Sequence, residues 1–196
     1  MRLAIDIDGV LRDTFLKIEQ LYQKFFIDEL EIVDDEFIYE IKTPYDTPDY
    51  KNHFMFKNDE EYISFIYEEF AMQIFGHAPS SEMSTFQILN ETYNKYKDRV
   101  DFVLISKEVG KTKPSTLFFI SKFGCEIDKV VFYNNLNKDK IWNEFDVLLT
   151  ANPELLKEDK NKTTIKFETT YNLTNNNELV ITSIKQLENK IENLLK

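Results

Sequence analysis

Two aspartates, Asp6 and Asp8, end a short apolar run early in the chain, and the residue after them, Gly9, is one of only four glycines among 196 residues. In a β-strand, residues two apart point to the same side, so both carboxylates would face one spot unless Gly9 has already turned the backbone. Like charges held together require a cation, a proton or a reaction partner. The alternative interpretation is a polar strand-to-loop turn, because Asp and Gly are common turn residues.

The stretch "DIDGVLRDT" at 6–14 resembles the first motif of the haloacid dehalogenase superfamily of phosphotransferases, in which D-x-D-G-[VT]-[LI] closes the first strand. The resemblance implies that Asp6 is the nucleophile that becomes an aspartyl phosphate. It also implies that Asp8 is the general acid and base, which protonates the leaving alkoxide and then activates water. Gly9 and Arg12 would help to bind the substrate. Within the superfamily, "DGVL" followed by a helical insertion is most similar to the deoxyribonucleotidase branch.

Two later residues match the second and third motifs of the superfamily. The second motif is a Ser or Thr that ends the next core strand, where "FVLISKE" supplies Ser106, whose hydroxyl would hold a phosphoryl oxygen. The third is a lysine near the start of a helix, where Lys111 and Lys113 are available. Lys113 fits better because Pro114 suits the first helical position. Taken alone, the serine is typical of a turn and the lysine of a solvated surface, so the order of the motifs carries this assignment.

The fourth motif departs from the family pattern. Family members place two acids after the next core strand, whereas "KVVFYNNLNKDKIW" has Asn134 and Asn135 there, and Asp139 fits only the second acid of the D-x-x-x-D form. The resemblance therefore implies a Mg²⁺ site formed by Asp6, Asp8, Asn135 and Asp139. An asparagine carbonyl can be a magnesium ligand but brings no charge, so we expect weak metal binding.

Strands that alternate with helices must position these residues. The pattern predicts strands at 3–7, 99–106, 129–133, 146–150 and 163–169, and helices at 113–124, at 137–142 and from Ser183 onward. Such alternation implies a parallel sheet that binds ligands beyond the carboxyl ends of its strands. We expect an α/β fold, a three-layer α/β/α Rossmann-like sandwich of the haloacid dehalogenase type, made of residues 1–13 and 98–196.

Residues 14–97 interrupt this alternation and are predicted to be mostly helical. Asp13 is the expected N-cap of the first helix and Asn58 begins the second, and a third helix runs to about residue 97. We interpret 14–97 as a helical cap inserted after the first strand. The apolar residues at helical spacing within it indicate helix packing rather than a ligand-binding aromatic face; they are Ile63, Ile66, Tyr67, Phe70 and Ile74.

The composition excludes several classes of protein. A hydrophobic content of 42% is too high for a disordered chain, and the apolar runs fall far short of the roughly 20 residues that span a bilayer. The formal net charge of −11 disfavours a long nucleic acid as partner. The lone Cys125 cannot form an internal disulfide, and acidic residues by position 6 are unlike a signal peptide, so we expect a cytoplasmic protein without a membrane partner.

The motifs together predict a magnesium-dependent phosphatase. It would hydrolyse a small phosphomonoester, for which a nucleotide is one candidate, through an aspartyl phosphate on Asp6. The presence of Asp8 favours phosphate chemistry over dehalogenation. The rival hypothesis is a catalytically weak or inactive relative that binds a phosphorylated ligand or a protein partner, and Asn134 and Asn135 are its support in the sequence.

Overall fold

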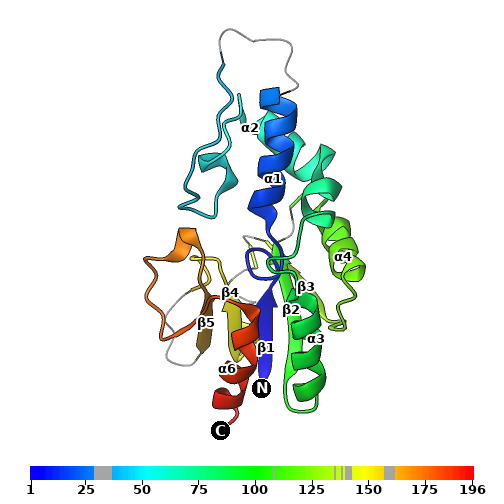
Figure 1. Cartoon of the computed structure of the whole chain (residues 1–196), viewed down its shortest axis with the longest axis vertical. Coiled ribbons are helices and arrows are strands. Elements are labelled where there is room, and N and C mark those ends of the chain that lie inside the picture. Colours follow the sequence, from blue (N-terminus) through cyan, green and yellow to red (C-terminus); the bar gives the residue numbers. More distant parts are fainter. Residues whose placement is uncertain (29–36, 108, 135, 138, 140–142, 157–161) are drawn as a thin grey trace.

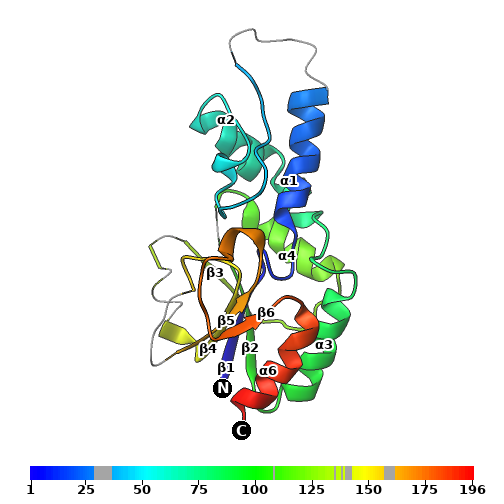
Figure 2. The same cartoon turned by 60° about the vertical axis from the view of Figure 1, so that its left-hand side comes forward.

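A computed structural model describes residues 1–28, 37–107, 109–134, 136–137, 139, 143–156 and 162–196. Within these ranges, six parallel strands form one sheet in the order β3-β2-β1-β4-β5-β6, and Figure 2 labels all six. The predicted parallel α/β fold is thereby confirmed. The strands are β1 (Arg2–Asp6), β2 (Asp101–Lys107), β3 (Val130–Tyr133), β4 (Val147–Thr150), β5 (Thr163–Phe167) and β6 (Leu179–Ile181).

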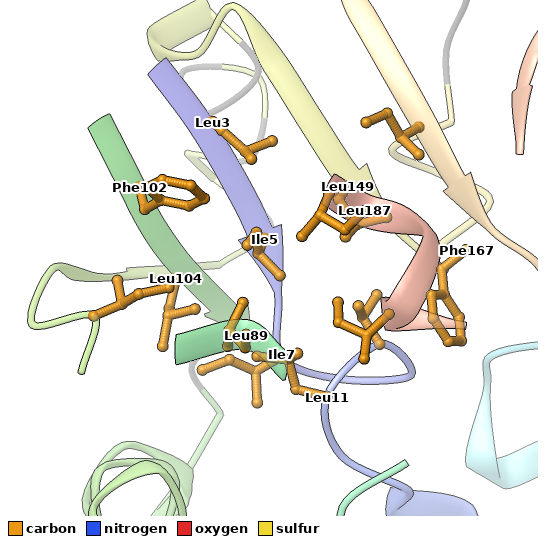
Figure 3. Packing of buried hydrophobic residues seen from close by; sticks show 14 of the residues in the cluster. Leu3, Ile5, Ile7, Leu11, Leu89, Phe102, Leu104, Leu149, Phe167 and Leu187 are labelled. Atoms are coloured by element: carbon orange, nitrogen blue, oxygen red, sulfur yellow. The ribbon is translucent and has the colours of Figure 1, made fainter. Parts of the chain in front are cut away.

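Alternate residues of the strands pack on opposite faces of the sheet, as strand geometry requires. On one face, Leu3 and Ile5 of β1 lie in a cluster with side chains of three helices, as Figure 3 shows for Leu89 and Leu187. On the other face, Ala4 lies in a separate buried cluster. The three helices are α3 (Thr85–Tyr96), α4 (Thr112–Lys122) and α6 (Leu187–Leu194).

A second body of helices lies beyond the carboxyl ends of the strands (Figures 1 and 2). We call described residues 14–28 and 37–77 the cap, because their side chains form their own hydrophobic cluster apart from the sheet. The predicted insertion extends to residue 97, and this boundary stays a prediction. The helix α3, which lies within the predicted insertion, packs on the sheet and not with the cap. The cap contains α1 (Thr14–Tyr22), η1 (Gln23–Asp28), η2 (Tyr50–Asn52), α2 (Asp59–Ile63), η3 (Ser64–Glu69) and η4 (Met72–Gly76).

The predicted helix starts are confirmed by their capping bonds. Asp13 accepts a hydrogen bond from the backbone N–H of Leu16 at 3.0 Å, and Asn58 accepts one from Glu61 at 2.9 Å. The helix predicted after Asn58 is broken, because 64–69 and 72–76 are separate π-helical segments. The helix expected at 137–142 falls mostly outside the described residues, and β6 is a strand that the sequence pattern did not predict.

Short helical turns connect the last elements of the C-terminal part. The turn η5 (Thr170–Asn172) follows β5. Ser183 is the N-cap of η6 (Ile184–Gln186), which continues directly into α6. No helix within the described residues is long and apolar enough to cross a membrane.

Candidate active site

A cavity of about 650 Å³ lies where the carboxyl edge of the sheet meets the cap. Asp6, Asp8 and Gly9 line it from the loop after β1, Lys107 and Tyr133 from the ends of β2 and β3, and further residues from the loops after β4 and β5. Aromatic residues of the cap line the opposite wall. The carboxyl ends of parallel strands are where ligands bind in open α/β sheets, so this cavity is the candidate active site.

Asp6 is the last residue of β1 and only 2% exposed. Its Oδ2 accepts a hydrogen bond from the Thr150 hydroxyl at 2.7 Å, whereas its Oδ1 is buried without a hydrogen-bond partner among the described residues. Burial, and after it the nearby Asp8 carboxylate, raises the pKa of Asp6 from its ordinary 3.8 to about 8. Asp6 is therefore a carboxyl group whose ionised form needs a cation close by.

Asp8 is held on both of its carboxylate oxygens. Its Oδ1 accepts hydrogen bonds from Arg12, at 2.6 Å from Nη2 and 3.1 Å from Nε, and from Thr14 at 3.1 Å. Its Oδ2 accepts one from the Ser106 hydroxyl at 3.0 Å. The Asp8 side chain is thus fixed beside Asp6 by groups from β2 and from its own loop.

Gly9 is required by both the backbone and the space around it. Its φ of +78° is a conformation that residues with a side chain rarely adopt. A Cβ atom there would overlap the Tyr171 hydroxyl and would lie 2.9 Å from the Cβ of Ala151. The backbone N–H groups of Leu11 and Arg12 both donate to the Ile7 carbonyl at 3.0 Å, which completes the tight turn. The loop conformation, rather than strand alternation alone, therefore sets where Asp8 lies.

Arg12 joins the sheet to the cap and is fully buried. Besides Asp8, its Nη1 donates to the carbonyl of Phe75 at 2.6 Å and to the Thr116 hydroxyl at 3.1 Å. Its guanidinium lies 5.1 Å from the ring centre of Phe75 and 5.2 Å from that of Phe119. These contacts give Arg12 a positioning function for Asp8, and direct contact with a substrate stays a prediction.

Ser106 of the second motif is buried next to Asp8, whereas Lys113 of the third motif is exposed. Ser106 is fully buried and uses its hydroxyl on Asp8, so it lies behind the cavity wall rather than on it. Lys113 is exposed, its Nζ lies 5.3 Å from the centre of the Phe132 ring, and it is not among the described residues that line the cavity. The structure brings Asp6, Asp8, Arg12 and Ser106 together, whereas Lys113 does not line the cavity and its role in the site stays a prediction. Among the described lysines, Lys107 is the one that lines the cavity.

The residues of the expected fourth motif do not reach the cavity in the described part of the chain. Asn134 uses its side chain within its own turn, where Oδ1 accepts from the Leu136 N–H at 2.9 Å. Asp139 is exposed and does not line the cavity, and Asn135 lies outside the described residues. The physical reason is the sheet order, since β2 separates β3 from β1. The strand that adjoins β1 on its other side is β4, which ends at Thr150.

The described residues could bind a magnesium ion through one carboxylate, that of Asp6. The described residues hold no group of three His, Cys, Asp or Glu side chains that could bind a metal, and of the predicted ligands Asp6 and Asp8 line the cavity, Asp139 does not, and Asn135 lies outside the described residues. The Asp6 carboxylate is nevertheless a hard oxygen donor beside the cavity. Magnesium commonly takes one or two carboxylates together with waters and substrate phosphate oxygens. This donor set fits a weakly bound ion.

Four tyrosines around the carboxylates were not among the predicted site residues. Tyr50 and Tyr67 reach the cavity from the cap, Tyr133 from the end of β3, and Tyr171 from η5. Burial raises the pKa of each hydroxyl, and the negative charge of Asp8 raises it further. They therefore stay protonated hydrogen-bond donors. Tyr133 ends a predicted strand and could have been noticed, whereas the spacing of Tyr67 indicated helix packing.

No protein-family model matches the chain, and no curated protein matches it either. Among solved structures, the crystal structure of a haloacid dehalogenase-like hydrolase from Burkholderia xenovorans LB400 matches with a TM-score of 0.61. The two chains are 11% identical, and the match covers 100% of this chain and 98% of that chain. The chain therefore has the α/β fold of a haloacid dehalogenase-like hydrolase.

Proposed function

We propose that the chain hydrolyses small phosphomonoesters, with Asp6 as the nucleophile. The observation that carries this proposal is the buried, unpartnered Oδ1 of Asp6, which lies beside Asp8 at the carboxyl edge of a hydrolase-type sheet. An enclosed carboxyl group with an unsatisfied oxygen is costly, and such groups concentrate at functional sites. The cavity of about 650 Å³ and the acidic net charge favour a small ligand over a long nucleic acid.

The reaction has two displacement steps at phosphorus. In the first, the proton that burial keeps on Asp6 moves to Asp8, and a carboxylate oxygen of Asp6 forms a bond to phosphorus while the bond between phosphorus and the alcohol oxygen breaks. Asp8 gives this proton to the leaving alkoxide. In the second, a water molecule attacks the same phosphorus, Asp8 takes the proton of that water, and the Asp6 carboxylate leaves. The products are the alcohol and inorganic phosphate, and both aspartates return to their starting state.

The neighbouring side chains hold these groups in place. Ser106 and Arg12 fix the two oxygens of Asp8, and Thr150 fixes Oδ2 of Asp6, which leaves Oδ1 as the free oxygen. The protonated hydroxyls of Tyr133 and Tyr171 line the cavity and can donate hydrogen bonds to the phosphoryl oxygens. Magnesium, bound by Asp6 and waters, would supply positive charge that favours the ionised carboxylate and offsets the charge of the phosphoryl group.

Steady-state hydrolysis tests this proposal. The purified full chain is assayed with para-nitrophenyl phosphate and a panel of small phosphomonoesters while Mg²⁺ is titrated. We expect turnover that depends on Mg²⁺ and is lost in Asp6→Asn. The matched control is Asp98→Asn, an exposed aspartate outside the cavity, which should keep the wild-type rate. Absence of turnover in the wild type, or full activity of Asp6→Asn, would reject the proposal.

Binding of a phosphorylated ligand without turnover is the second candidate. It is favoured by the end of β4, where Thr150, Ala151 and Asn152 carry no carboxylate and the first acid of this loop that lines the cavity is Glu154. This candidate predicts that phosphomonoesters bind to the chain at equilibrium while none is hydrolysed at any Mg²⁺ concentration. Calorimetry beside the kinetic panel therefore separates the two functions.

A further inference from the structure

The cap wall of the cavity is built mainly from aromatic rings. We call the six aromatic cap residues that line it the roof: Phe15, Tyr45, Tyr50, Tyr62, Tyr67 and Phe75. Together they present apolar ring surfaces and phenol hydroxyls to the ligand, opposite the carboxylates of the sheet. A phosphomonoester bound over Asp6 would place its alcohol part against this wall.

The rings of the roof meet in steep pairs and also in stacked pairs, among them Tyr67 on Phe75 at 14°. Phe15 stacks on Tyr45 with 4.6 Å between ring centres, while Tyr50 meets Phe15 edge-on at 4.9 Å and 75°. On the other side, Tyr67 meets Tyr62 at 86°. Rings at steep angles form concave corners, the arrangement in which aromatic side chains surround an alkylammonium group.

The charges of the cavity lining are mostly negative. Its described cationic residues are Arg12, which is committed to Asp8, and the exposed Lys107. The described part of the lining contributed by the cap contains the carboxylates of Glu19 and Asp49 but no Lys, Arg or His. A phosphate ester with a neutral alcohol part would bring only further negative charge into this space.

Glu19 is the acid most closely tied to the roof. It is half-buried, and the hydroxyl of Tyr45 donates to its Oε2 at 2.7 Å. Asp49 is exposed and accepts a bond from the N–H of Lys51 in its own turn. Glu19 therefore combines a fixed negative charge with a position next to an aromatic corner, and it is the counter-ion that a bound cation would meet.

We propose that the substrate is a phosphomonoester whose alcohol part carries a positive charge, an amino alcohol or a quaternary ammonium alcohol. Its ammonium group lies against the roof near Glu19 while its phosphoryl group lies over Asp6. This inference rests on the proposed function and names the substrate class of the same site. It also explains how an acidic cavity accepts a phosphate ester, because the substrate brings its own compensating charge.

The test compares two esters of equal shape and different charge. Phosphocholine carries a trimethylammonium group, and 3,3-dimethylbutyl phosphate has carbon in place of that nitrogen. With the wild-type chain we expect kcat/KM to be at least about tenfold higher for phosphocholine. Glu19→Gln should reduce this ratio severalfold, while Glu68→Gln, an exposed cap glutamate that does not line the cavity, should keep it.

Each remaining outcome decides between the two proposals. If both esters are hydrolysed with equal kcat/KM, the charged-substrate inference is overturned and the phosphatase function stands. If no ester is hydrolysed, the phosphatase function fails, and calorimetry with choline and 3,3-dimethylbutan-1-ol then tests the cavity directly. Tighter binding of choline supports a cation-selective cavity, whereas equal binding, or none, overturns it.

Discussion

The two walls of the cavity are built on different principles. The sheet side, which we call the floor, consists of polar groups fixed by hydrogen bonds: Asp6, Asp8 and Arg12 line the cavity, and Ser106 and Thr150 hold the two aspartates from behind. The roof consists of aromatic rings that pack on one another, with few fixed polar contacts. We expect the floor to determine the reaction and the roof to determine which substrates bind. Variants of the floor should therefore have larger effects than variants of the roof.

Asp6→Asn should give the largest change in stability of the variants considered. The folded pKa of about 8 lies above the unfolded value, so between about pH 4 and pH 8 the folded state binds a proton that the unfolded state does not. Stability of the wild type should then fall as the pH rises through this range. The asparagine variant lacks this fall, so it should be more stable than the wild type by a few kcal/mol at pH 9, and nearly equal to it at pH 4.

Urea unfolding without Mg²⁺ at a series of pH values measures this difference. The exposed Asp98→Asn serves as the control and should follow the wild type at every pH. A wild-type stability that does not change between pH 5 and pH 8 relative to Asp6→Asn would show that Asp6 is ionised in the folded chain.

Arg12→Met should be the most destabilising variant of the floor. The methionine keeps much of the side-chain volume but removes the charged partner of Asp8, which keeps only its bonds from Thr14 and Ser106, and the donor of the Phe75 carbonyl. Removal of one partner of a buried ion pair costs about 3 kcal/mol or more. Chemical denaturation should detect this loss, and Arg99→Met, at an exposed position, should cost less than about 0.5 kcal/mol.

Gly9→Ala separates backbone strain from crowding. Alanine at a positive φ costs roughly 1–2 kcal/mol, and at Gly9 the added methyl also meets Tyr171 and Ala151. Gly124 has a similar φ of +64° with nothing within 4 Å of the added atom. We therefore expect Gly9→Ala to cost more than Gly124→Ala, and Tyr171→Phe to recover part of the difference. Equal costs for the two glycines would mean that the loop moves aside without penalty.

Tyr45→Phe should have the smallest effect. It removes the hydroxyl that donates to Glu19 but keeps the ring stacked on Phe15. The expected loss is about 0.5–1 kcal/mol in thermal unfolding. If Tyr45→Phe lowered the free energy of unfolding as much as Arg12→Met does, the roof would depend on its hydrogen bonds as strongly as the floor. The contrast between the two walls would then be wrong.

The floor was largely predictable because local sequence controls it. The strand that ends in Asp6 and the glycine that turns the chain after Asp8 follow from a five-residue pattern. Ser106 was predicted at a strand end, but its bond to Asp8 was not, because a hydroxyl can serve either a ligand or a neighbour. The parallel sheet followed in the same way from the alternation of strands and helices.

The strand order and the roof could not be predicted in the same way. The strand to which the fourth motif was assigned, β3, lies at the edge of the sheet beyond β2, and the chain then crosses to β4 on the other side of β1, so the neighbour of β1 is β4 and not β3. Tyr67 and Phe75 have the spacing of ordinary helix packing, and only the tertiary structure turns them toward a cavity. Residues that several segments bring together leave no local pattern in the sequence.

Trapping of the covalent intermediate tests the central claim most directly. The wild-type chain is mixed with a phosphomonoester and Mg²⁺ in a single turnover, quenched in acid and digested, and the peptide that contains Asp6 is analysed by mass spectrometry. We predict one added phosphoryl group on Asp6, and none anywhere in Asp6→Asn. Turnover without a phosphoryl group on Asp6, or a phosphoryl group on another residue, would contradict the assignment of Asp6 as the nucleophile.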